Sequence, residues 1–183
     1  MTSTLKINNL DTASGTTITI PTGKQLIGTD TNSIKAPGQI INVTGTVHTA
    51  GTSTTSSNFT TLFSHTITPT STSSKIFIVI SIGGLYLNLS AQSNQSHWRI
   101  GRSIGGASDD VPVNHNTNFH TEIGRNATSA GSRANVDMTT LDSPNTTSAI
   151  EYKVQCKIFT GTNGIKINDT AGTSTMTLFE IAQ

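Results

Sequence analysis

The sequence predicts an all-β protein, a jelly-roll-like antiparallel β-sandwich head preceded by an extended N-terminal β arm. Apolar and polar residues alternate with a period of two in many short segments, whereas no stretch keeps a helical period. Threonine is abundant, and its β-branched side chain favours pleated strands. Gly, Ser, Asn and Pro turn signals separate the alternating segments, as is typical of sandwiches and jelly rolls.

About seven to nine strands are expected after residue 38. The pattern alone leaves open whether they form a jelly roll or an immunoglobulin-like sandwich, although the Cys and Trp framework of true immunoglobulin domains is absent. The last segment is strongly apolar, so we expect it to be paired inside a sheet. The segments are Gly38–Val47, Asn58–Pro69, Lys75–Ile82, Leu85–Leu89, His97–Arg102, Ala134–Leu141, Ala149–Phe159, Gly164–Asn168 and Met176–Ala182.

The strongest strand signal is Lys75–Ile82. Both of its faces carry apolar residues, so the sequence predicts a central strand that is buried on both sides. Gly83 and Gly84 follow it and are expected to break or bend the strand. Gly45, inside an earlier segment, is a candidate β-bulge.

Residues 1–37 differ in character from residues 38–183, and we predict a domain boundary between the two. The first part holds short apolar fragments, including a strand-like one at Thr16–Ile20, punctuated by Gly and Pro. Each fragment is too short to bury its apolar face alone. The arm is therefore expected to pack on another chain or on copies of itself around an axis, and the alternative is a flexible arm.

Charge and cysteine content exclude several classes of protein. Only 11% of the residues are charged and the formal net charge is +1. No basic cluster is present, so we expect no nucleic-acid partner. No segment reaches the roughly 18–20 apolar residues of a membrane span, and no signal peptide is evident, which predicts folding in the cytoplasm without membrane insertion. The single Cys156 alternates with polar residues and is expected to be a small buried hydrophobe.

The titratable residues suggest neither catalysis nor metal binding, so we expect no enzymatic activity and no cofactor. Asp109 and Asp110 are adjacent but follow a Gly-rich stretch that indicates a solvated turn. Glu151 and Glu180 are single charges within strands, expected to face solvent or pair with a Lys. His115 and His120 are close in sequence, yet no zinc-type spacing surrounds them.

A binding surface is better supported. The loop-rich region of residues 90–133 concentrates aromatic, Arg and His side chains, which interfaces use as anchors and which suit sugar rings. For Trp98 two interpretations stay open, a surface anchor or a core residue beside Ile100. The candidate binding residues are Trp98, Arg99, Arg102, His115, Phe119, His120 and Arg125.

The order of these segments resembles small fibre proteins and fibre-tip domains of tailed bacteriophages, particularly marine ones. The similarity covers nearly the whole chain, and its motifs are turn and strand sequences rather than catalytic ones. The segments that carry it are Thr4–Leu10, Gly15–Lys24, Ala36–Ile41, Thr66–Pro69, Ser73–Ile76, Leu141–Pro144 and Leu178–Ile181.

The resemblance implies a homotrimer within the virion, in which residues 1–37 attach to other tail, baseplate or connector proteins. The three sandwiches would form a head whose loops bind a host-surface glycan or protein. An alternative is a purely architectural virion protein, such as a head decoration or a neck or connector-bound fibre. A third interpretation is a glycan hydrolase at a fibre tip.

Overall fold

The computed structural model describes residues 21–25, 27, 34, 36–87, 94–107, 111–113, 120–125, 132–160 and 164–183. Its contacts divide the chain into two units, Met1–Ile34 and Lys35–Gln183. In the first unit, a turn is closed by the Lys24 amide, which donates to the Pro21 carbonyl at 3.0 Å. The strand expected at Thr16–Ile20 lies outside the described residues.

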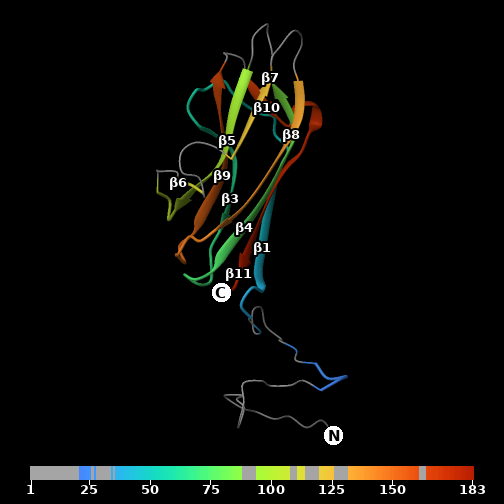
Figure 1. The fold of residues 1–183 in the computed structure, drawn as a ribbon, viewed down its shortest axis with the longest axis vertical. Helices are drawn as coiled ribbons and strands as arrows, with labels where there is room; N and C mark the ends of the chain where they lie inside the picture. The colour runs from blue at the N-terminus through green and yellow to red at the C-terminus, as the bar shows by residue number, and fades with distance from the viewer. Residues whose placement is uncertain are drawn as a thin grey trace. The chain divides into compact units, whose positions relative to one another are not determined.

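The second unit is an antiparallel β-sandwich, which confirms the predicted fold class (Figure 1). One layer, sheet A, has the strand order β1-β11-β4-β10-β2, with β8 also paired to β4. The other layer, sheet B, has the order β3-β9-β5-β6, with β7 also paired to β5. The elements are β1 (Ile40–His48), β2 (Thr52–Thr54), β3 (Thr60–Ile67), β4 (Lys75–Leu87), β5 (Asn94–Ile104), β6 (Val111–Pro112), β7 (Thr121–Arg125), β8 (Ser132–Asp142), β9 (Ile150–Thr160), β10 (Ile165–Ile167), the 3₁₀ turn η1 (Asp169–Ala171) and β11 (Ser174–Ile181).

Strand β4 is central in sheet A, as predicted, and it lies between β11 and β8. Every second side chain from Ile76 to Ile82 is completely buried in the sandwich. The prediction that both faces are buried is wrong, because Phe77 on the opposite face is 37% exposed. Successive side chains of a strand point to opposite faces, and in this sheet one of the two faces lies at the surface.

The glycines after this strand bend it rather than end it. The β4–β8 register shifts between Ile82 and Leu85, and Gly84 has a φ of 59°, in the left-handed region. A Cβ on Gly83 would lie 2.3 Å from the Thr173 carbonyl oxygen. A Cβ on Gly172 would lie 2.8 Å from the Gly84 Cα, so the two backbones meet directly.

The bulge predicted at Gly45 is found elsewhere in the same strand. Gly45 stays in register with Thr177, whereas the β1–β11 register shifts between Ile40 and Asn42. Periodicity identified the strand but not the place of its irregularity, because a Gly in a strand does not by itself require a bulge.

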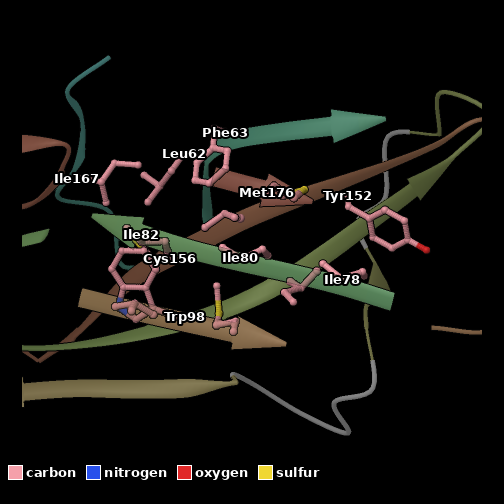
Figure 2. Close-up of a cluster of buried hydrophobic side chains, with 14 of the residues drawn as sticks. Leu62, Phe63, Ile78, Ile80, Ile82, Trp98, Tyr152, Cys156, Ile167 and Met176 are labelled. Carbon is pink, nitrogen blue, oxygen red and sulfur yellow. The ribbon is translucent and has the colours of Figure 1, made fainter. Parts of the chain in front are cut away.

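The core lies between the two sheets and contains Trp98 and Cys156. Trp98 and Cys156 are completely buried among isoleucine and leucine side chains (Figure 2). Of the two interpretations of Trp98, a surface anchor or a core residue, the core residue is therefore correct. The burial of Cys156 confirms the expectation of a small hydrophobe, and it raises the pKa of the thiol to about 12.

A buried polar contact connects the two sheets. Arg102 on β5 donates from Nη1 to both carboxylate oxygens of Asp142 on β8. The Tyr152 hydroxyl on β9 donates to the same carboxylate at 2.7 Å. The Asp142 side chain is 6% exposed and that of Arg102 is 20% exposed. Burial, together with the neighbouring Asp142 charge, raises the pKa of Tyr152 far above its usual range.

A second buried carboxylate holds the loop between β3 and β4. Glu180 is completely buried, and its Oε1 accepts hydrogen bonds from the Thr70 amide at 2.6 Å, the Thr70 hydroxyl at 2.8 Å and the Ser74 hydroxyl at 2.7 Å. The expectation of a solvent-facing or Lys-paired Glu180 is wrong, because neutral donors of a distant loop bind its Oε1, while its Oε2 is buried without a hydrogen-bond partner. Glu151 does pair with Lys153, at 3.3 Å.

We expect Asp142→Ala to lower the free energy of unfolding by about 3 kcal/mol, because it leaves Arg102 poorly solvated without its partner. Tyr152→Phe removes one hydrogen bond and should cost about 1.5 kcal/mol. The control Thr139→Ala changes an exposed residue of the same strand and should stay within about 0.5 kcal/mol. Urea unfolding followed by Trp98 fluorescence measures all three, and equal losses for Asp142→Ala and Thr139→Ala would refute the bridge.

Candidate binding surface on sheet B

The outer face of sheet B carries polar and charged side chains from its two central strands. On β5, Arg99 lies between the buried Trp98 and Ile100 and points to the opposite side of the strand. On β9, Gln155 pairs with Arg99 across the strands, and Lys157 pairs with His97. The β-sheet therefore holds these side chains on one rigid surface.

An aromatic and cationic cluster forms the centre of this surface. The Arg99 guanidinium carbon lies 4.0 Å from the centre of the Phe59 ring, and the Lys157 ammonium lies 4.9 Å from it. Both distances are within the range of cation–π attraction. The cluster of Phe59, Arg99 and Lys157 thus brings two positive charges onto one aromatic ring.

Gln155 fixes the orientation of Arg99. The Arg99 Nε donates to the Gln155 Oε1 at 2.7 Å, and the Gln155 Nε2 donates to the Thr61 hydroxyl at 3.2 Å. A Cβ on Gly101 would lie 2.7 Å from the Gln155 Oε1, so the absence of a side chain at Gly101 leaves space for this amide. The guanidinium is preorganised by these bonds, which lowers the entropy lost on binding.

His97 borders the cluster. Its ring stacks on Phe159 with centroids 4.2 Å apart, and its Nε2 lies 3.2 Å from the Glu122 carboxylate. Burial lowers the pKa of His97 below 6.5, and the nearby Glu122 opposes this shift without cancelling it. His97 is therefore a neutral residue at neutral pH, and it adds no positive charge to the surface.

The candidate residues from the sequence occupy different environments. Trp98 lies in the core and donates from Nε1 to the Ser96 hydroxyl at 2.9 Å. Arg102 forms the bridge to Asp142 between the sheets. His120 is half-buried, and its Nδ1 accepts a hydrogen bond from the Ile100 amide at 3.2 Å. Of the seven candidates, Arg99 belongs to the cluster on sheet B.

The side chains of the other three candidates lie outside the part of the chain that the structure describes. His115 and Phe119 lie outside the described residues, as does the side chain of Arg125, whose backbone belongs to β7. Phe59 and Lys157 belong to the surface but lie outside the region that the sequence singled out. The alternation on β9 pointed Lys157 away from Cys156, but no sequence signal placed β9 beside β5.

Other features of the described residues offer little chemistry. An open hollow of about 250 Å³ is lined by hydroxyl, amide and small apolar groups from Ala36, Pro37, Ile41, Thr70, Ser71, Ser73, Ser74, Ala182 and Gln183. In the described part of the chain, no three His, Cys, Asp or Glu side chains are grouped so that they could hold a metal ion. Asp109 and Asp110 lie outside it.

We expect His97 to make the fold sensitive to acid. Its folded pKa is below 6.5, so the unfolded chain binds more protons once the pH falls below about 6.5, and stability decreases there. His97→Phe keeps a ring against Phe159 and removes the titration. The melting temperature of this variant should therefore fall less between pH 7 and pH 5 than that of the wild type. Identical decreases in both proteins would contradict this role of His97.

Comparison with known proteins gives similarities of structure alone. No family model and no curated protein matches the sequence. Structures of infectious bursal disease virus are similar: the Gx strain at 14% identity and a TM-score of 0.39, and the Gt strain at 13% and 0.36. The match to the Gx strain covers 87% of this chain and 43% of that one, so the chain spans less than half of its length.

The VP2 subviral particle of the same virus is similar at 10% identity and a TM-score of 0.36, over 87% of this chain and 42% of that one. With TM-scores below 0.5, these similarities support no conclusion about the function of this chain. Within the residues that the structure describes, no helix has the length and apolar character to cross a membrane.

Proposed function

We propose that this chain is a structural subunit of a tailed-bacteriophage virion, a tail fibre or fibre tip that binds a host-surface receptor through its head. Residues 1–37 attach it to other virion proteins, and the subunits form a homotrimer. The resemblance of the turn and strand motifs supports the class of protein. The cluster of Phe59, Arg99 and Lys157 on sheet B is the observation that supports binding.

The chemistry of this cluster fits an acidic sugar. The exposed part of an aromatic ring can pack against the C–H face of a pyranose, and a guanidinium or ammonium group binds a carboxylate or sulfate. The exposed Thr61 provides a hydroxyl nearby, and the buried Gln155 connects it to Arg99. Three such sites in a trimer would bind a cell surface by avidity, so each site can be weak.

The loop residues named from the sequence stay part of this proposal. His115 follows β6, Phe119 precedes β7 and Arg125 is the last residue of β7, and both strands pair with β5, the strand that carries Arg99. Trp98 and Arg102 are assigned to the core and to the bridge between the sheets, where they support β5 rather than contact a receptor.

The architectural alternative is favoured by a different observation. Phe77, Leu141 and Val43 are exposed on the outer face of sheet A, at 37%, 43% and 55%. A purely architectural virion protein would cover such a face with other virion proteins and would bind no receptor. Binding to host cells separates this alternative from the receptor-binding function.

We expect purified protein to bind saturably to cells of a host that the parent particle infects. Arg99→Ala should weaken this binding about tenfold, roughly 1.4 kcal/mol, because it removes a charge and its cation–π contact. Arg133→Ala is the matched control, since Arg133 also lies over a ring, that of Tyr86 at 5.6 Å, but on sheet A. Wild-type affinity in Arg99→Ala would exclude the cluster, and absence of binding by the wild type would favour the architectural alternative.

Deletion of residues 1–37 should abolish incorporation into particles and leave the head folded, because all the strands β1–β11 begin at or after Ile40. Circular dichroism and the urea unfolding midpoint measure folding, and immunoblotting of purified particles measures incorporation. An unfolded product would show that the boundary at residue 37 is wrong.

A further inference from the structure

A stripe of apolar side chains crosses the outer face of sheet A at right angles to its strands. The strand registers place Val43 of β1 beside Phe179 of β11, Phe179 beside Phe77 of β4, and Phe77 beside Leu141 of β8. The rings of Phe77 and Phe179 contact each other, with centroids 6.0 Å apart. We call these four residues the apolar stripe.

The surface around the stripe is apolar or uncharged on one side. Ile40 and Val47, at the two ends of β1, are 52% and 64% exposed. Between them, the outward residues of β1 and β11 carry no charge: they are Ile40, Val43, Gly45, Val47, Thr175, Thr177, Phe179 and Ile181. Charges lie on the β4–β8 side, with Lys75 at one end and Asp137 toward the other.

This face differs from the outer face of sheet B, where Arg99, Lys153, Lys157 and Glu151 are found on the central strands. The largest apolar patch on a typical monomer covers about 300–600 Å² and is often functional. The two outer faces of the sandwich therefore differ in chemistry: that of sheet B carries charges on its central strands, whereas the apolar stripe of sheet A carries none.

The apolar area of the face can be compared with that of protein interfaces. Valine, leucine, isoleucine and phenylalanine residues each expose roughly 150–200 Å² when fully accessible, so the exposed fractions of Ile40, Val43, Val47, Phe77 and Leu141 give on the order of 450 Å² of apolar surface. A standard interface buries about 800 Å² per partner, and somewhat over half of it is apolar. In a closed ring of copies the face takes part in two contacts, so this apolar area is divided between them. Ile40, Val43 and Val47 lie on the half that faces one neighbour, and Phe77 and Leu141 lie on the half that faces the other.

We propose that the outer face of sheet A is the surface through which copies of this chain associate, with the apolar stripe at its centre. The inference rests on the homotrimer of the proposed function and names its interface. The stripe runs across the strands at one level. When copies are arranged around an axis along the strands, their stripes meet at the same height, and the uncharged β1–β11 half of one copy packs on the β4–β8 half of the next.

Such a head-to-tail contact places the two ends of the stripe against each other. Val43 lies on one edge strand of this part of the sheet and Leu141 on the opposite one. Within one copy they are separated by three strand spacings, roughly 14 Å. Charges introduced at these two positions therefore interact mainly between copies, which makes the contact testable by charge.

The test measures the mass of the full-length protein in solution by light scattering. The wild type should be an oligomer of the 19.2 kDa chain. Val43→Lys combined with Leu141→Lys places like charges across the contact and should give monomers. Val43→Lys combined with Leu141→Glu places opposite charges there and should retain the oligomer. Thr66→Lys is the control, an exposed change on β3 of sheet B that should leave the mass unchanged.

Circular dichroism and the fluorescence of the buried Trp98 verify the fold of each variant, and both substituted positions are exposed. A wild-type oligomer that keeps its mass in the double-lysine variant overturns the interface and leaves the homotrimer standing. A monomeric wild type overturns both and points to residues 1–34 of the same chain, or another virion protein, as the cover. Receptor binding is tested separately through Arg99.

Discussion

The alternation of β4 is the constraint on which the rest of the molecule depends. Ile76, Ile78, Ile80 and Ile82 are all completely buried, and a slip of one residue would turn them to the surface. The same alternation forces Phe77 outward, where its neighbours across the strands are also apolar. The buried core and the exposed apolar stripe therefore result from the same strand register. No register of β4 can place both sets of side chains on the core face.

Polar contacts then fix how the two sheets and their loops fit together. The Arg102–Asp142–Tyr152 contact joins β5 and β9 of sheet B to β8 of sheet A. Glu180 joins β11 to the loop before β4. These hydrogen bonds form only in one relative position of the strands and loops, so they favour one arrangement over slightly shifted ones with a similar apolar core. The same strands position the side chains on the outer surface of sheet B.

The features that depend on residues close together in the sequence could be predicted from the sequence. The strands, the central place of β4, the bend at Gly83 and the burial of Cys156 follow from alternation and residue type. The short strands β2 and β6 escaped prediction because two or three residues show no period. The roles of Arg102 and Glu180, and the contact of Arg99 with Phe59, depend on residues about 40 to 110 positions apart, and no single segment encodes such pairings.

Gly83, Gly84 and Gly172 bring two chain segments together through main chain alone, without any side chain between them. The Asn168 amide completes this closure by donating to the Gly83 carbonyl at 3.1 Å. Because backbone atoms alone form this close contact, the contact does not depend on the chemistry of the surrounding side chains. These three positions are therefore closed to any side chain, because a Cβ at any of them would lie 2.3–2.8 Å from a main-chain atom. A substitution at any of the three would therefore have to separate β4 from the segment that joins η1 to β11.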